Sequence, residues 1–359
     1  MLLDAALDVF VDALAGEAVP WRTLSLFVDA LGRFGCHPAH VHKAGLVGKF
    51  QRLENHLAAR MDDSPPTPVH LGRVVLGYLR MQRQLRGPLL EAVLRASLVQ
   101  APNMNAQALC SMVWGLGRHG LRCGREVPRA WVEAMVSQAD AFMKDLVGVD
   151  VVQLAEGLDA MHYSPAPALL DRMERVMLYG ARDLDTNGIV TFVRALADMG
   201  HEVRPEAWDT LVRRLSGSGP EVLGAGGRGG FGVAQAVWAC GDPRRRPPVE
   251  VMHTIEREIE RLWEAGPHRG LQPLVRACIV TGLIRAKYVP RHPGARRDFY
   301  SVLSHHLKGS ARDGRDPWEE VGRWRYHGAP WRDFVYLFSR RTRERQLRRQ
   351  GRRDGGPDP

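Results

Sequence analysis

Side chains that could bind a planar or phosphate-bearing ligand recur at two fixed places before a repeated apolar position, which we call the anchor. Five residues before the anchor stand the polar residues Ser111, Gln153, Thr191 and Gln235. Two residues before it stand Trp114, Arg194, Trp238 and Arg276. Because the two places are three residues apart, they share one face of a helix. Such side chains can hydrogen-bond base edges or stack on bases, so they are candidate contacts for single-stranded RNA.

A structural interpretation of the same positions stays open beside the functional one. Trp114 and Trp238 can serve packing alone, and the polar residues can form hydrogen bonds between neighbouring copies of the repeat. The sequence does not decide between these interpretations, because both require a polar residue at the border of an apolar stripe.

Clusters of basic residues supply the electrostatic side of the same hypothesis. The chain has a net charge of +10, which favours a polyanionic partner. The candidate phosphate contacts are Arg244, Arg245, Arg246, Arg285, Lys287, Arg340, Arg341 and Arg343. The last three belong to the run 340–353, "RRTRERQLRRQGRR". Arginine-rich tails often become ordered on RNA, although such a run can also be a solvated tail or a targeting signal.

Patterns that could indicate an enzyme or a metal site are weak. The glycine-rich stretch 216–232 has no GK[ST] and follows no apolar strand, so we interpret it as an insertion. His37, His40 and His42 lie near Cys36 but lack a second ligand pair at zinc-finger spacing, which favours a loop. We therefore predict no catalytic residue, no cofactor, no metal and no small-molecule substrate.

The elements that position these residues can be found from the anchor column. The anchors are Leu31, Leu79, Leu116, Leu158, Leu196, Cys240 and Cys278. Apolar residues also recur seven, four and three positions before the anchor, which predicts one buried helical face per copy. Directly before the anchor the residue is small in six copies: Ala30, Gly115, Gly157, Ala195, Ala239 and Ala277. A small residue there would let a neighbouring helix approach closely.

Each copy then offers a second helix that begins at proline. These prolines are Pro88, Pro128, Pro167, Pro205 and Pro248, and a proline in the first turn costs no hydrogen bond. Two helices in a unit of about 38 residues form a hairpin that cannot bury both of its apolar stripes alone. The expected fold is therefore all-α, an α-solenoid (superhelix) of about seven helix-turn-helix repeats.

The predicted domain organisation follows from the repeats. Residues 1–315 form the solenoid with an insertion at 216–232, residues 316–338 a C-terminal cap, and residues 339–359 a basic tail that we expect to be disordered. The five Cys show no CxxC pairing, which argues against a disulfide framework. No apolar run reaches the length of about 20 residues that a membrane span needs. The first residues resemble neither a signal peptide nor a transit peptide.

These residues resemble the octotricopeptide repeat proteins, which are similar to pentatricopeptide proteins. The best matches are "ALCSMVWGLGRHG" (108–120) and "GVAQAVWACG" (232–241), and the resemblance covers roughly residues 20–285. The clear strand pattern of the C-terminal RAP domain that many relatives carry is not visible. The resemblance implies binding of RNA in a chloroplast or mitochondrion, to stabilise, process or translate a transcript. The alternative is a non-catalytic scaffold, such as a ribosome-associated subunit or a protein adaptor.

Overall fold

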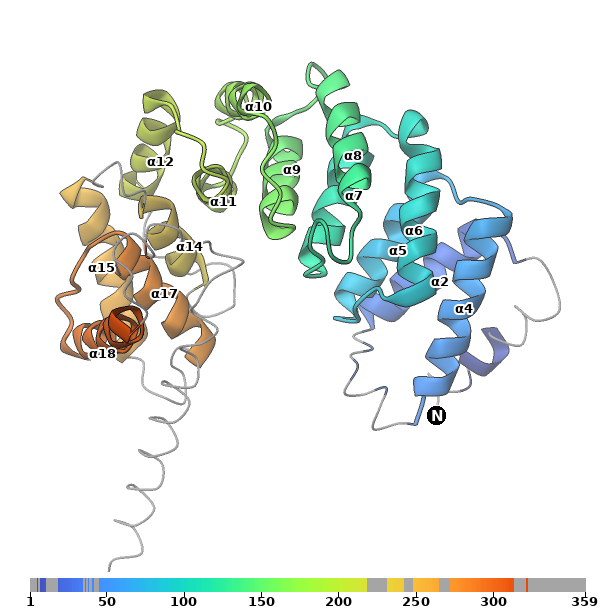
Figure 1. Ribbon diagram of the computed structural model, residues 1–359, viewed down its shortest axis with the longest axis horizontal. Helices are drawn as coiled ribbons and strands as arrows, with labels where there is room; N and C mark the ends of the chain where they lie inside the picture. The colour runs from blue at the N-terminus through green and yellow to red at the C-terminus, as the bar shows by residue number, and fades with distance from the viewer. Residues whose placement is uncertain are drawn as a thin grey trace, which may run out of the picture. The chain divides into compact units, whose positions relative to one another are not determined.

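The computed structural model describes residues 5, 7–10, 19–34, 36, 38, 41, 45–217, 231–241, 248–264, 272–312 and 321. The chain divides into two compact units, residues 1–176 and 177–359, which we treat separately. In the described part every extended element of regular structure is a helix (Figure 1). A single isolated bridge joins Cys123 and Val127 in the described residues. The predicted all-α helical-repeat fold is confirmed.

The first unit consists of helical hairpins stacked in two layers. The helices that carry the anchors are α2 (Trp21–Arg33), α5 (Pro68–Arg80), α7 (Ala106–Arg118) and α9 (Gly148–Ala160). Each of these anchor helices packs on the next. The second helices are α4 (Val47–Asp63), α6 (Gly87–Gln100) and α8 (Arg129–Ala141), and they pack on one another in the same order. A short 3-10 helix, η1 (Ala101–Asn103), follows α6, and α10 (Pro167–Tyr179) follows α9.

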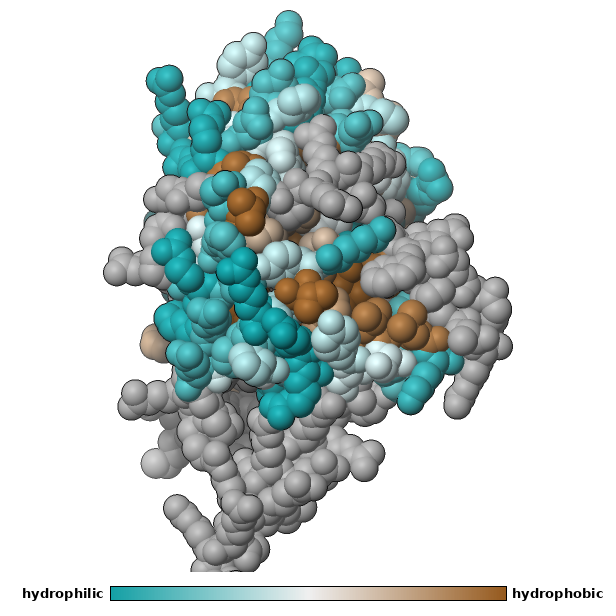
Figure 2. All heavy atoms as spheres, turned by 90° about the vertical axis from the view of Figure 1, so that its left-hand side faces the viewer, coloured by the Kyte–Doolittle hydropathy of each residue, from teal (hydrophilic) through white to brown (hydrophobic). Residues whose placement is uncertain are grey.

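The second unit repeats this arrangement. Its anchor helices are α11 (Thr186–Asp198), α14 (Phe231–Cys240) and α17 (Pro273–Arg285), packed in that order. Its second helices are α12 (Pro205–Gly217), α15 (Val249–Glu264) and α18 (Pro293–Arg312), which also pack successively. In Figure 2, which views the left-hand side of Figure 1, hydrophilic side chains cover most of the visible described surface and apolar ones occupy smaller areas between them. Most of the apolar stripes are thus buried between helices.

The buried columns confirm most of the predicted repeat. The anchors Leu116, Leu158 and Leu196 are fully buried. Trp131 of α8 and Val251 of α15, which belong to the apolar stripes of the second helices, are buried as well. Six anchor helices have the same length of 13 residues: α2, α5, α7, α9, α11 and α17. The predicted second-helix prolines lie within the first turn or directly before it. The sequence pattern therefore identified the hairpin correctly.

The predicted register is wrong in two copies. In α5 the fully buried residue is Tyr78, whereas Leu79 is only half-buried, so the anchor lies one residue earlier. In α17 the anchor is Leu283, five residues after Cys278, because the helix ends two residues later as it does after Leu116. The first correction places a small residue, Gly77, directly before the anchor where Tyr78 had been the exception, and the second keeps a small residue there, Gly282 in place of Ala277.

A common C-terminal turn supports the corrected register. The backbone N–H five residues after the anchor donates to the anchor carbonyl in five copies. These pairs are Cys36–Leu31, Arg83–Tyr78, Tyr163–Leu158, His201–Leu196 and Tyr288–Leu283. A positive φ four residues after the anchor accompanies this turn at Gly200 (82°), Gln82 (54°) and Lys287 (53°). This is the Schellman ending of a helix, and it fixes where each connector begins.

Glycines allow the anchor helices to touch backbone to backbone. A Cβ atom at Gly157 of α9 would lie 2.7 Å from the Val113 carbonyl oxygen of α7, and one at Gly117 would lie 2.5 Å from the Gly157 carbonyl oxygen. Gly77 of α5 would likewise meet the Val28 carbonyl oxygen of α2 at 2.8 Å. The predicted role of the small residue before the anchor is confirmed at Gly157.

Substitution of Gly157 by Ala tests this contact. The added methyl group has no space between α7 and α9, so Gly157→Ala should lower the free energy of unfolding by about 2 kcal/mol. The matched control is Gly72→Ala in α5, where no atom lies within 4 Å of the added Cβ. That change should be neutral or stabilising by up to about 1 kcal/mol, through helix propensity. Thermal unfolding monitored by far-UV circular dichroism measures both variants. Equal melting temperatures would contradict the close contact between α7 and α9.

Candidate functional site

The polar residues five positions before the anchor bond to one another across neighbouring anchor helices. The Ser111 hydroxyl of α7 donates to the Gln153 side chain of α9 at 3.0 Å. The Thr191 hydroxyl of α11 donates to the Gln235 side chain of α14 at 3.2 Å. Ser111, Gln153 and Gln235 are half-buried and Thr191 is buried. These contacts match the structural interpretation, in which the polar residues form hydrogen bonds between neighbouring repeats. Part of the hydrogen-bonding capacity of these side chains is therefore used within the protein.

The two tryptophans also pack between repeats. Trp114 is half-buried, and its Nε1–H donates to Glu156 Oε2 of α9 at 2.7 Å. Arg118 reaches the same carboxylate at 3.3 Å and lies over the Trp114 ring. Trp238 is fully buried, and its Nε1–H donates to the Cys278 carbonyl oxygen of α17 at 2.8 Å. A fully buried ring offers no face to a ligand.

Two predicted RNA-contacting arginines lie in the interior of the second unit. Arg194 of α11 is fully buried and Arg285 of α17 is 4% exposed. Both donate to the buried Asp198 carboxylate, Arg194 at 3.3 Å and Arg285 at 2.5 Å. The Arg285 guanidinium also lies over the Trp238 ring at 5.2 Å. Arg194 was predicted to line the groove and Arg285 to contact phosphate, but Asp198 holds both side chains in the interior, where neither is exposed to a ligand.

Arg276 and Lys287 have different environments. Arg276 of α17 is half-buried, forms an ion pair with the buried Asp298 of α18, and lies over Trp263 of α15 at 5.6 Å. In the corrected register Arg276 lies seven residues before the anchor, which explains why it joins helices instead of facing the same way as Trp114. Lys287 is exposed in the turn after α17.

Several predicted positions lie outside the described residues. These are Arg244, Arg245, Arg246, Arg340, Arg341, Arg343, His37, His40, His42, nearly all of the insertion 216–232, the cap 316–338 except Val321, and the tail 339–359.

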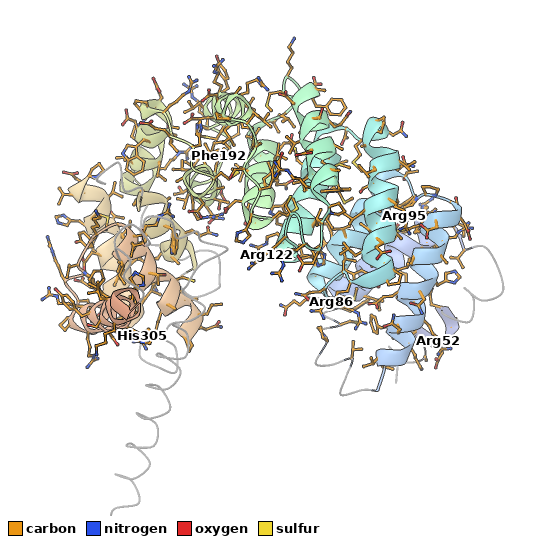
Figure 3. The ribbon with its side chains drawn as sticks, in the orientation of Figure 1. Arg52, Arg86, Arg95, Arg122, Phe192 and His305 are labelled. Atoms are coloured by element: carbon orange, nitrogen blue, oxygen red, sulfur yellow. The ribbon has the colours of Figure 1, made fainter. Side chains whose placement is uncertain are left out.

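A row of arginines in the first unit was missed by the search for helical columns. Arg52 lies near the start of α4, Arg86 directly before α6, and Arg122 in the connector from α7 to α8. In Figure 3 the three side chains follow one side of the unit, on three successive hairpins. We call Arg52, Arg86 and Arg122 the arginine row. In the described part of the chain none of the three has an ion-pair partner, whereas Arg95 binds Asp62 at 2.9 Å.

The connectors of the first unit explain why charge collects on this side. The described connectors 81–86 and 119–128, which follow α5 and α7, contain Arg83, Arg86, Arg122 and Arg125 and one acid, Glu126. Arg83 is paired with Glu54, and the connector 161–166 after α9 contains no Arg, Lys, Asp or Glu. The connectors 64–67, 101–105 and 142–147, which lead into anchor helices, contain only Lys144 and Asp145 as charged residues. Since alternate connectors of stacked hairpins lie at opposite edges, one edge is basic. The signal was present in the loop composition.

This edge is suited to binding phosphate groups. Exposed guanidinium groups bind phosphate bidentately and stay charged at any physiological pH. In the described residues no helix is long and apolar enough to cross a membrane. Cys110 and Cys240 are buried, and burial raises the pKa of Cys240 to about 12, so this thiol is no nucleophile.

Removal of Arg285 tests its interior role. Arg285→Met should lower the free energy of unfolding of the second unit by about 3 kcal/mol, because the buried Asp198 carboxylate loses one of its cationic partners. The control Arg297→Met, at an exposed position of α18, should stay within about 0.5 kcal/mol of the parent. Urea denaturation followed by tryptophan fluorescence measures both. An Arg285→Met protein as stable as its control would show that the pair is not needed.

His119 of α7 should make the first unit sensitive to acid. Its ring is 5% exposed, and Nε2–H donates to the Val75 carbonyl oxygen of α5 at 3.1 Å. Burial lowers the pKa of His119, and the hydrogen bond to Val75 offsets this only in part. The unfolded chain therefore binds a proton at a higher pH than the folded chain, so stability falls as the pH drops below about 6.5. His119→Gln should reduce the loss of stability between pH 7.5 and 5.5, and an equal loss in both proteins would refute the assignment.

Comparison with protein-family models finds no matching family, and comparison with curated proteins finds no matching relative.

Proposed function

We propose that this chain is a non-catalytic RNA-binding protein, in which the arginine row contacts the phosphates of the RNA backbone. The observation that carries the proposal is the row itself. Arg52, Arg86 and Arg122 stand on three successive hairpins at one edge, and none of their guanidinium groups has an ion-pair partner in the described part of the chain, although the Arg122 backbone N–H donates to the Glu126 carboxylate at 3.0 Å. A phosphate would not have to displace an intramolecular carboxylate to reach them.

Successive hairpins give the row a regular spacing. Packed helices lie about 8–10 Å apart, so cations on neighbouring hairpins follow one another at a separation that a flexible single strand can match. Each neutralised phosphate releases a counterion, so several such contacts give an affinity that falls steeply with salt. A linear polyanion fits this row better than a compact anion does.

The polar residues beside the anchors support binding through the backbone more than reading of bases. Ser111 and Thr191 already donate to the glutamines of the next helix, and Trp114 donates to Glu156. A base would have to compete with these bonds. We therefore propose contact with phosphates as the main source of affinity, with little preference for sequence.

The resemblance to octotricopeptide repeat proteins supports the same proposal and adds its cellular setting. Proteins of that class act on RNA in chloroplasts or mitochondria, and we propose the same location for this chain. A role as a ribosome-associated scaffold uses the same edge, with folded ribosomal RNA as the partner.

Neutralising the row tests the proposal directly. The triple variant Arg52→Gln, Arg86→Gln and Arg122→Gln should bind a fluorescent single-stranded RNA at least about tenfold more weakly at low salt. Three lost phosphate contacts should also reduce the slope of log K against log salt by about 2. Fluorescence anisotropy over a salt series measures both quantities.

A control with the same change of charge lies at the other edge of the unit. Arg22 is the second residue of α2, Arg73 lies in the first half of α5, and Lys144 lies in the connector before α9. The variant Arg22→Gln, Arg73→Gln and Lys144→Gln should keep the parent salt slope. Equal losses of RNA affinity in the two variants would mean that only net charge matters. Failure of the parent protein to bind RNA would refute the proposal.

A further inference from the structure

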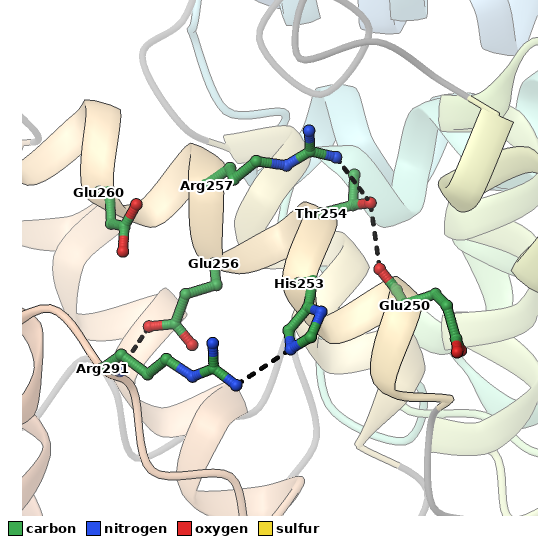
Figure 4. Close-up of a pocket in the computed structure, with 7 residues that line it drawn as sticks. All are labelled: Glu250, His253, Thr254, Glu256, Arg257, Glu260 and Arg291. Carbon is green, nitrogen blue, oxygen red and sulfur yellow. Dashed lines mark hydrogen bonds between the residues drawn. The ribbon is translucent and has the colours of Figure 1, made fainter.

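A polar cavity in the second unit is separate from the arginine row. It has a volume of about 580 Å³ and lies between α15 and the connector that follows α17 (Figure 4). Its lining residues are Glu250, His253, Thr254, Glu256, Arg257, Glu260 and Arg291. The volume falls within the range of small-molecule sites, which is roughly 300–1,000 Å³.

Glu256 fixes the connector that forms one wall of the cavity. This carboxylate is 3% exposed and accepts hydrogen bonds from the Arg291 and His292 backbone N–H groups and from the Tyr288 hydroxyl. Burial and the bond to Glu256 raise the pKa of Tyr288 to about 12, so the hydroxyl stays a donor. The three donors offset the charge of Glu256 and hold Arg291 at the cavity.

Two guanidinium groups in the cavity, those of Arg257 and Arg291, are suited to an anion. The Arg291 guanidinium donates to His253 Nε2 at 3.0 Å, which requires a neutral His253 with its proton on Nδ1. Arg257 is exposed, and its guanidinium makes a long hydrogen bond of 3.4 Å to the Thr254 hydroxyl. No carboxylate in the described part of the chain forms an ion pair with the side chain of Arg257 or Arg291. Two guanidinium groups with spare N–H donors can hold a phosphate.

Two carboxylates in the same cavity require a ligand that also has donors. Within the described residues the side chains of Glu250 and Glu260 have no hydrogen-bond or ion-pair partner. They would repel a simple anion, whereas they can accept hydrogen bonds from hydroxyl groups. Among the described residues no three His, Cys, Asp or Glu side chains of this cavity bring ligand atoms within 4.8 Å of one another, as a metal ion held by three of them would require.

We propose that this cavity binds one ribonucleotide, with its phosphate on Arg257 and Arg291 and its ribose hydroxyls on Glu260. Carboxylates accept ribose hydroxyls in nucleotide sites, and the 2′-hydroxyl distinguishes RNA from DNA. The ligand is a free nucleotide or one unit of an RNA chain, and the two share this chemistry. The site does not depend on the arginine row.

Binding of adenosine 5′-monophosphate to the full chain, measured by calorimetry at fixed ionic strength, tests the proposal. Adenosine, which lacks the phosphate, and 2′-deoxyadenosine 5′-monophosphate should each bind at least tenfold more weakly. Arg291→Gln should lower the affinity for the nucleotide at least tenfold, and Arg257→Gln serves as an independent second variant. Glu260→Gln should bring the ribose and deoxyribose affinities close together.

Matched controls lie outside the cavity, one on α15 and one on α18. Glu264→Gln at the end of α15 and Arg297→Gln on α18 should leave nucleotide binding unchanged, with helicity and melting temperature checked for every variant. A 5′-phosphorylated triribonucleotide distinguishes a free nucleotide from one unit of an RNA chain as the ligand. If it binds more tightly than the mononucleotide, the ligand is an RNA chain, and if it does not bind, the ligand is a free nucleotide. Absence of nucleotide binding, binding of inorganic phosphate equal to that of the nucleotide, or unchanged affinity in Arg257→Gln and Arg291→Gln would overturn the proposal. Repeating the assay in the arginine-row variant shows that its outcome is independent of the proposed function.

Discussion

Contact between the backbones of neighbouring anchor helices is the constraint on which the first unit depends. Gly117 and Gly157 allow α7 and α9 to approach until a single methyl group would collide, and Gly77 does the same between α5 and α2. At such separations each helix covers the apolar face of the next, and neither face is buried by one hairpin alone. In the second unit Gly282 of α17 plays this part against the side chain of Trp238.

Close approach also decides what the polar residues beside the anchors do. When two helices touch, side chains at equivalent positions on them come within hydrogen-bonding distance, which is the case for Ser111 and Gln153 and for Thr191 and Gln235. Groups that a sequence pattern presents as free for a ligand are thereby shared between repeats. The connectors leave the stack: Arg83 is paired there with Glu54, whereas Arg86 and Arg122 have no ion-pair partner among the described residues.

Much of the fold could be predicted from one sequence, since a buried helical face imposes a period on residue type that survives in every copy. The predicted register was wrong where the apolar period allowed two positions for the anchor. In α5 an aromatic residue, Tyr78, fills the buried place beside an equally apolar Leu79, and α17 is apolar on nearly every side. The burial of Arg285 could not be predicted, because its acidic partner Asp198 lies 87 residues earlier in the sequence. For Arg194 the sequence did hold a signal, since Asp198 stands one turn later on the same helix.

The same residue type therefore has opposite roles in this protein, and the difference depends on acids and not on arginine. Asp198 and Asp298 hold Arg285 and Arg276 among the helices, where a charge without such a partner would be costly. Arg52 and Arg122 have no such acid in the described part of the chain, and they lie at an edge that water solvates. A net charge of +10 counts both kinds alike. Its distribution over connectors carries the functional information, because only a solvated cation can exchange its water for a phosphate.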